Sequence, residues 1–262
     1  MKTKIAIIGG GPAGLSCAYF LALQGYRPTV FEKNEHPGGM LRYGIPSFKL
    51  EKDVIDAEID ILRELGVTIR CGVEVGKDVT LANLRAQGYK AFYLAIGCQG
   101  GRTAGVPGED AAGIQTAVAL LRTVGGDESH KMTGKTVVIG GGNVAIDAAR
   151  VALRCGSSDV TMVCLEPREK MPASAEEIAE AEEEGTAIRC GYGPKEFLTK
   201  DGHVCGVVLK RCTGLYDAEG RFAPTYDESV TITLPCDNVV LSIGQCIQWL
   251  SLIHISEPTR PR

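Results

Sequence analysis

The stretch Lys4–Glu32, KIAIIGGGPAGLSCAYFLALQGYRPTVFE, decides the fold. It begins with a short, β-branched apolar run, which is typical of a buried parallel strand. Pro12–Gln24 then predicts a helix, because a proline stands in its first turn and Gly25 follows its end. A second strand is expected over Arg27–Phe31. This order of strand, glycine turn, helix and strand predicts a βαβ unit in a parallel sheet.

The glycines of the turn follow the G-x-G-x-x-G pattern of dinucleotide-binding sites. Gly9 permits the tight turn, Gly11 lets a pyrophosphate approach the backbone, and Gly14 lets the helix pack closely on the strand. The helix start offers unpaired N–H groups and partial positive charge to the phosphates. Glu32, which follows the second strand, is placed to bind the adenosine ribose hydroxyls. The predicted cofactor contacts of this first site are Gly9, Gly11, Pro12, Ala13, Gly14 and Glu32. The alternative is that the glycine turn binds no ligand.

The alternation of strands and helices continues beyond this unit. A loop rich in Gly and Pro covers Asn34–Pro46, and Lys52–Leu65 predicts an amphipathic helix. Its expected apolar face comprises Val54, Ile55, Ile59, Leu62 and Leu65. Strands are expected over Val67–Arg70 and Ala91–Ile96.

The pattern then begins again, with a second glycine motif between a strand at Thr136–Ile139 and a helix at Asn143–Leu153. Alanine in place of the third glycine still allows close packing. A second nucleotide site is therefore predicted, the alternative being a decayed copy that no longer binds. Its expected contacts are Gly140, Gly142, Asn143, Val144 and Ala145. The elements expected after it are strands at Asp159–Cys164, Ala187–Cys190, Val230–Leu234 and Asn238–Ile243, an acidic helix at Ser174–Glu184, and a hairpin of Lys195–Thr199 and His203–Arg211 around Asp201-Gly202.

Composition excludes several other functions. The formal net charge is −4 without a basic block, and no apolar run approaches the roughly 20 residues that cross a bilayer, so neither nucleic acid nor a membrane is an expected partner. The ten cysteines are scattered singly without a C-x-x-C, and the four histidines lack metal-ligand spacing. We therefore predict no metal site and no redox-active disulfide. Buried single cysteines imply a reducing compartment, and we expect the cytoplasm.

Several segments together resemble the glutamate synthase small subunit family. That family includes the flavin-carrying part of dihydropyrimidine dehydrogenase and the large subunit of ferredoxin–NADP transhydrogenases. The resemblance runs from about Lys4 to Gln245. The segments that carry it are Gly9–Gly14, Glu32, Pro37–Leu41, Tyr43–Pro46, Phe48–Leu50 and Val106–Asp110.

The resemblance implies FAD on the first unit and a nicotinamide cofactor on an inserted second unit. It also implies that hydride passes from the nicotinamide to the flavin and that electrons leave singly to an iron–sulfur protein or domain. No catalytic acid–base dyad is obvious, so no catalytic residue is predicted, because the cofactors carry this chemistry. The oligomeric state is left open. The residues expected beside the FAD cofactor are Gly39, Leu41, Val75 and Gly97.

The predicted fold class is α/β, with two Rossmann-like dinucleotide-binding units in three layers with parallel sheets, the second inserted into the first. The expected boundaries are an FAD unit at residues 1–105, an NAD(P) unit at 106–245 and a non-family tail at 246–262. Leu250–Pro261 resembles translated cloning sequence, and the family's second FAD segment with its Gly-Asp motif is expected to be missing. The chain is thus expected to be a truncated oxidoreductase, or alternatively a nucleotide-binding module without turnover of its own.

The choice of nicotinamide cofactor depends on the loop after the strand that ends at Cys164. Glu166 and Arg168 are further expected cofactor contacts, and Glu166 lies 21 residues past Ala145, where a carboxylate would bind a ribose 2′-hydroxyl. Glutamate synthase small subunits that use NADPH carry arginines where Leu165 and Glu166 stand. A 2′-phosphate about 4 Å from a carboxylate would be repelled by roughly 4 kcal/mol per charge pair at an effective dielectric near 20. The sequence therefore favours NAD(H) over NADP(H), although Arg168 or Lys170 could compensate, and Glu166 could instead be a solvated strand end.

Overall fold

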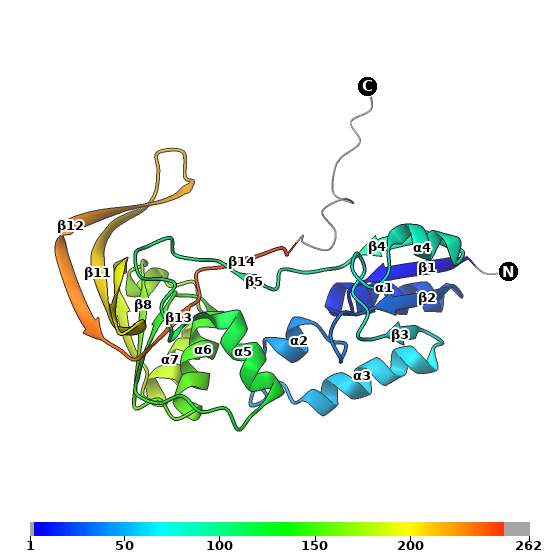
Figure 1. The fold of residues 1–262 in the computed structure, drawn as a ribbon, viewed down its shortest axis with the longest axis horizontal. Helices are drawn as coiled ribbons and strands as arrows, with labels where there is room; N and C mark the ends of the chain where they lie inside the picture. The colour runs from blue at the N-terminus through cyan, green and yellow to red at the C-terminus, as the bar shows by residue number, and fades with distance from the viewer. Residues whose placement is uncertain (1–2, 249–262) are drawn as a thin grey trace. The chain divides into compact units, whose positions relative to one another are not determined.

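The computed structural model describes residues 3–248, which divide into two compact units (Figure 1). One unit contains residues 3–100 together with 246–248, and the other contains Gly101–Gln245. The second unit is therefore inserted into the sequence of the first. The chain passes between them through β5 (Gly100–Gly101) and β14 (Gln245–Cys246), which pair with each other. The first division falls after Gly100 rather than after residue 105.

The first unit is built on a parallel sheet of four strands in the order β3-β2-β1-β4. The strands are β1 (Lys4–Ile8), β2 (Arg27–Phe31), β3 (Thr68–Arg70) and β4 (Tyr89–Leu94). The helices are α1 (Pro12–Leu23), α2 (Met40–Tyr43), α3 (Lys52–Glu64) and α4 (Leu81–Ala86). The short helix α2 lies inside the segment that was predicted to be a loop, and β4 begins and ends two residues before the predicted strand at Ala91–Ile96.

Both faces of the sheet are buried at β1 and β2, as the apolar run in β1 predicts, whereas β4 is largely exposed. Ile7 packs with residues of α1 and its neighbouring strands, whereas Ile8 packs toward Leu84 of α4. The helix α3 buries Ile55 and Ile59. The predicted apolar face of α3 was too wide, because Val54 is 50% exposed and Leu65, which follows the helix, is 40% exposed.

The second unit has three layers around a parallel sheet in the order β6-β13-β7-β8-β9. Its strands are β6 (Ile114–Thr116), β13 (Asn238–Leu241), β7 (Lys135–Ile139), β8 (Asp159–Cys164) and β9 (Ala187–Cys190). The helices α5 (Ala117–Gly126), α6 (Asn143–Arg154) and α7 (Ala175–Glu183) share one core with its first face. An antiparallel sheet of β10 (Tyr192–Lys200), β11 (His203–Tyr216) and β12 (Phe222–Pro235) shares another core with its second face.

The predicted hairpin turn is present, with positive φ at Asp201 (53°) and Gly202 (79°). The strands extend further than predicted, because β11 continues to Tyr216 and β12 begins at Phe222. None of the helices between residues 3 and 248 has the length and apolarity needed to span a membrane.

The predicted acidic helix is present as α7, and carboxylates on it and at its end pair with arginines of α6. The buried guanidinium of Arg150 contacts Glu180 at 2.5 Å and Glu184 at 2.7 Å, and it lies 3.6 Å from Glu177. Arg154 also pairs with Glu184. These ion pairs join the second half of α6 to α7, so much of the negative charge of α7 is paired within the unit.

Replacing Glu184 with glutamine tests this cluster. Hydrogen bonds from Arg154 and then Arg150 lower the pKa of Glu184 from its ordinary value to about 2. A lowered pKa means that the ionised carboxylate stabilises the fold above its ordinary pKa, and that this contribution fades as the pH falls towards 2. We expect Glu184→Gln to lower the free energy of unfolding by about 1–3 kcal/mol at pH 7. The difference from wild type should shrink below about pH 5.

The measurement is urea unfolding of both proteins at several pH values. Glu183→Gln is the matched control, because Glu183 is an exposed neighbour on the same helix. Equal destabilisation by the two substitutions would contradict a specific role for the Arg150 cluster.

Candidate nucleotide-binding sites

The turn between β1 and α1 requires glycine at two positions for reasons internal to the protein. Gly9 has φ +108°, and a Cβ atom there would lie 2.3 Å from the carbonyl oxygen of Ala95. Its N–H donates to the carbonyl of Phe31 at 2.8 Å. A Cβ on Gly14 would lie 1.9 Å from the carbonyl oxygen of Gly9, so the helix can approach the strand only with glycine there. These are the roles that the sequence predicted for the first and third glycines.

Among the described residues, no close contact requires glycine at the second position of the motif. Gly11 has an ordinary φ of −81°. A Cβ atom there would meet, among the described residues, only the Cα of Gly39 at 3.7 Å, which is ordinary van der Waals contact. Gly11 also lines a cavity at the carboxyl ends of the strands. The protein itself would therefore accept a side chain at this position, and the space is left for something outside the chain.

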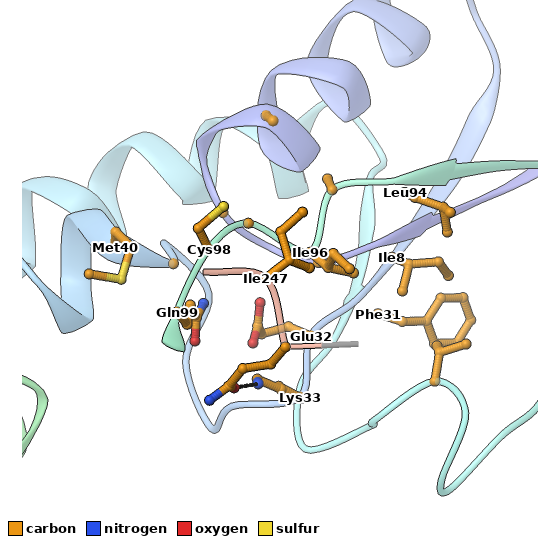
Figure 2. Close-up of a pocket in the computed structure, with 18 of the residues that line it drawn as sticks. Ile8, Phe31, Glu32, Lys33, Met40, Leu94, Ile96, Cys98, Gln99 and Ile247 are labelled. Carbon is orange, nitrogen blue, oxygen red and sulfur yellow. Dashed lines mark hydrogen bonds between the residues drawn. The ribbon is translucent and has the colours of Figure 1, made fainter. Parts of the chain in front are cut away.

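The cavity has a volume of about 400 Å³ and lies entirely within the first unit. Figure 2 shows Glu32 near its centre, with Ile8, Phe31 and Leu94 towards one end. Met40, Cys98 and Gln99 lie towards the other end in the same view. Lys33 donates a hydrogen bond of 3.5 Å to the side chain of Gln248, drawn as a dashed line. A long, largely apolar cavity with few polar groups is typical of a small-molecule site.

Glu32 is almost fully buried, with 3% of its surface exposed, and its carboxylate is held in one orientation. Its Oε2 accepts from the N–H of Gly10 at 2.7 Å, and its Oε1 accepts from the backbone and side-chain nitrogens of Asn34 at 2.8 and 2.6 Å. A carboxylate has about four lone-pair sites, two on each oxygen, so Oε1 is fully used by Asn34 and Oε2 retains capacity for a hydroxyl group. The buried charge is thus fixed beside the cavity and can still accept a hydrogen bond from a ligand.

The structure brings most of the predicted residues of the first site together. Those that line the cavity are Gly9, Gly11, Pro12, Ala13, Glu32, Gly39, Val75 and Gly97. Gly14 lies behind it as a packing position. Leu41 is not among the lining residues, because it packs against the core formed by Leu15, Ile55 and Ile59.

Sequence analysis missed several lining residues: Lys33, Met40, Val73, Ile247 and Gln248. The alternation of Val73 with Val75 was an available signal for one of them. Ile247 and Gln248 fall in the segment that was predicted to be a non-family tail, yet they form part of the cavity wall. The rest of that predicted tail, from residue 249 on, lies outside the described residues.

The second unit repeats the arrangement of the first. Gly140 has φ +148°, and a Cβ atom there would lie 2.3 Å from the carbonyl oxygen of Ser242. At Gly142 no described atom lies within 4 Å of a Cβ position. A Cβ on Gly141 would meet Glu166 Oε2 at 2.9 Å, just as one on Gly10 would meet Glu32 Oε2 at 3.0 Å. A carboxylate therefore stands against the glycine loop in both units.

The remaining predicted residues of the second site have different surroundings. Ala145 is fully buried, while Val144 is 38% exposed. Asn143 uses its side-chain oxygen to accept from the N–H of Ser174 at 2.9 Å, which ties the helix start to the following loop. Arg168 pairs with Glu182, so its guanidinium is already committed to a carboxylate of α7.

Comparison with known proteins identifies the relatives of this chain. A sequence profile described as pyridine nucleotide-disulphide oxidoreductase matches residues 3–248. The NADP(+)-dependent formate dehydrogenase subunit beta of Moorella thermoacetica is 42% identical over 246 residues, covering 92% of this chain and 35% of that protein. The glutamate synthase (NADPH) small chain of Escherichia coli strain K12 is 34% identical over 264 residues, covering 95% of this chain and 56% of that protein. The predicted resemblance is confirmed, and the chain spans only part of the length of these relatives.

A solved structure shows the same fold. FprA of Mycobacterium tuberculosis in complex with NADPH superimposes with a TM-score of 0.80 at 22% identity, covering 94% of this chain and 71% of that chain. The predicted α/β class with Rossmann-like units is therefore confirmed.

Two substitutions distinguish a glycine that is needed for packing from a glycine that leaves space for a ligand. In the ligand-free protein we expect Gly14→Ala to lower the free energy of unfolding by about 1–3 kcal/mol, because its methyl group collides with the carbonyl of Gly9. Gly11→Ala should change it by no more than about 0.5 kcal/mol. Urea unfolding followed by circular dichroism measures both. A large loss with Gly11→Ala would show that this glycine serves packing after all.

Proposed function

We propose, since this chain belongs to the pyridine nucleotide-disulphide oxidoreductase family, that it binds FAD on its first unit and a nicotinamide dinucleotide on its second, and acts as an NAD(P)H-dependent flavoprotein oxidoreductase. The observation that carries this proposal is the pair Gly11 and Gly142. Each is the second glycine of a strand–turn–helix motif, and at each the described protein leaves a Cβ position without a close contact. A glycine at a helix start leaves the backbone without a side chain, so a pyrophosphate can approach it closely.

The residues of the first unit would hold FAD in distinct ways. The start of α1 would face the pyrophosphate with its N–H groups, because no side chain caps this helix in the described structure. Glu32 would accept a hydrogen bond from the adenosine ribose. Gly39 and Gly97, both with positive φ, would keep the cavity wall free of side chains. In the second unit, Gly142 and the start of α6 would hold the other pyrophosphate.

The bound cofactors would supply hydride transfer from nicotinamide to flavin. The protein's contribution is to orient them and to exclude water, so a catalytic acid–base pair is not required. We propose an iron–sulfur protein or domain as the electron acceptor, in keeping with the family resemblance, and a cytoplasmic location.

The first test is the visible absorbance spectrum of the purified, dialysed protein before and after anaerobic addition of NADH or NADPH. A flavin spectrum that bleaches supports both cofactor sites and electron transfer between them. A protein that takes up no flavin after incubation with excess FAD would overturn the proposed activity. It would leave, at most, a nicotinamide-binding module without turnover.

Gly11→Ala gives a sharper test of the FAD site. Because its methyl group would occupy the space left for the pyrophosphate, we expect the dissociation constant for FAD to rise at least about tenfold, or 1.4 kcal/mol. Flavin fluorescence titration measures it. Gly126→Ala is the matched control, since no described atom lies within 4 Å of its Cβ position and it does not line the cavity. Equal affinities in the two variants would contradict pyrophosphate binding at Gly11.

We further propose that the second unit prefers NAD(H) to NADP(H). Glu166 places Oε2 against Gly141, and Arg168, the nearest cation in the same loop, is paired with Glu182. The two relatives named above carry NADP(H) in their names, so the alternative is that Arg168 leaves Glu182 to receive a 2′-phosphate.

The preference is tested by measuring the dissociation constants of NADH and NADPH. We expect wild type to bind NADH at least about tenfold more tightly, and Glu166→Gln to reduce that ratio. Glu169→Gln, an exposed neighbour, is the control. Tighter binding of NADPH by wild type would overturn the preference.

A further inference from the structure

Two cysteines that are far apart in sequence meet at the nucleotide-binding edge of the second unit. Cys164 ends β8 and Cys190 ends β9, and the parallel register pairs them directly. Their sulfur atoms lie 3.7 Å apart, and Met171 Sδ lies 3.8 Å from Cys190 Sγ. Sequence spacing does not reveal this pair, because it is made by two adjacent strands rather than by a C-x-x-C turn.

We propose that Cys164 and Cys190 form a reversible oxidation site that reports on peroxide or disulfide oxidants and controls nucleotide binding. In the reaction, Cys190 attacks hydrogen peroxide and becomes a sulfenic acid, releasing one water. The Cys164 thiol then displaces a second water and closes the disulfide. Overall, two thiols lose two hydrogen atoms and one peroxide is reduced to two waters.

The surroundings assign the two steps to different sulfurs. Cys164 is only 2% exposed, whereas Cys190 is half-buried and so within reach of solvent. Burial, and then the neighbouring Cys190, raise the pKa of the Cys164 thiol, so the first attack on the oxidant falls to Cys190. Cys164 reacts second and gives its proton to the departing hydroxide, which leaves as water.

Bridging would be reversible for a geometric reason. Adjacent strands lie about 4.8 Å apart, which is within the usual Cα separation of disulfides but at its short end. The sulfurs must approach from 3.7 Å to about 2.0 Å while the backbone ladder holds the strands. A bridge formed against the hold of the ladder would be reduced more readily than a structural disulfide, as regulatory disulfides are.

The bridge would act on nucleotide binding through Glu166. The Cys164 thiol donates to the carbonyl oxygen of Glu166 at 3.5 Å, and the N–H of Gly191 donates to the same oxygen at 3.2 Å. A Cβ on Gly141 would lie 2.9 Å from the Cβ of Cys164, so this side chain lies directly under the glycine loop. Drawing Cys164 Sγ towards β9 would remove its hydrogen bond to Glu166 and shift this residue, whose carboxylate would bind the ribose 2′-hydroxyl under the proposed preference for NAD(H). This effect rests on the proposed function, whereas the bridge itself does not.

The test treats the full chain with hydrogen peroxide, blocks free thiols with N-ethylmaleimide and maps the digested peptides by mass spectrometry. We expect a cross-linked peptide that joins Cys164 to Cys190 and disappears with dithiothreitol. The dissociation constant for NADH should rise at least about fivefold after oxidation and recover on reduction. Cys190→Ser should abolish both effects. Cys205→Ser, which changes an exposed cysteine of the same unit, should retain them.

The outcomes are distinguishable. Recovery of Cys164 and Cys190 only as separate alkylated or over-oxidised peptides overturns the oxidation site. A bridge that leaves the NADH affinity unchanged overturns its control of binding. If the reduced protein binds neither NADH nor NADPH, the proposed function fails, while the peptide map still decides whether the bridge forms. Thermal unfolding of Cys190→Ser, with Cys190→Ala as a second variant, shows that a lost response does not come from lost folding.

Discussion

One steric contact governs each unit: a backbone carbonyl presses against the first glycine of the turn. In the first unit the oxygen of Ala95, just beyond β4, occupies the place that a side chain on Gly9 would take. In the second unit the oxygen of Ser242, just beyond β13, does the same at Gly140. Each contact therefore excludes a side chain at the residue that follows β1 or β7, where the glycine turn leads into the helix. The proposed ligand sites lie at these two turns.

The third position of each motif shows that the two units differ in how closely the helix packs on the glycine turn. In the first unit, Gly14 touches the Gly9 carbonyl so closely that even a methyl group is excluded. In the second unit, Ala145 carries such a methyl group and buries it completely in the core. The second positions, Gly11 and Gly142, are alike in both units in lacking a close described contact. What the two turns share is therefore the space for a ligand rather than the details of helix packing.

Sequence patterns predicted the elements that obey local rules and missed those that depend on contacts. The run in β1 and the proline start of α1 identify a Rossmann turn without further information. Helix α2 is different, because only the left-handed backbone of Gly39 allows four residues to coil within a glycine-rich loop. Likewise, periodicity cannot tell that Val54 is exposed, since this depends on which residues α3 presents to α1. The motif residues of the first site were predictable because the family resemblance covers them. Gln248 was not, because it lies far from them in sequence and only the folded chain brings it to the cavity.

The two carboxylates show why similar motifs need not have equal selectivity. Glu32 follows β2 directly and is fixed by three N–H donors from Gly10 and Asn34. In the second unit Cys164 lies against the glycine loop instead, and Glu166 reaches the loop from two residues further on. Its position is set by what holds its backbone carbonyl, namely Gly191 and the Cys164 thiol. Under the proposed function, discrimination between a ribose hydroxyl and a phosphate would therefore depend on how this loop is anchored at Cys164 as well as on the charge of Glu166.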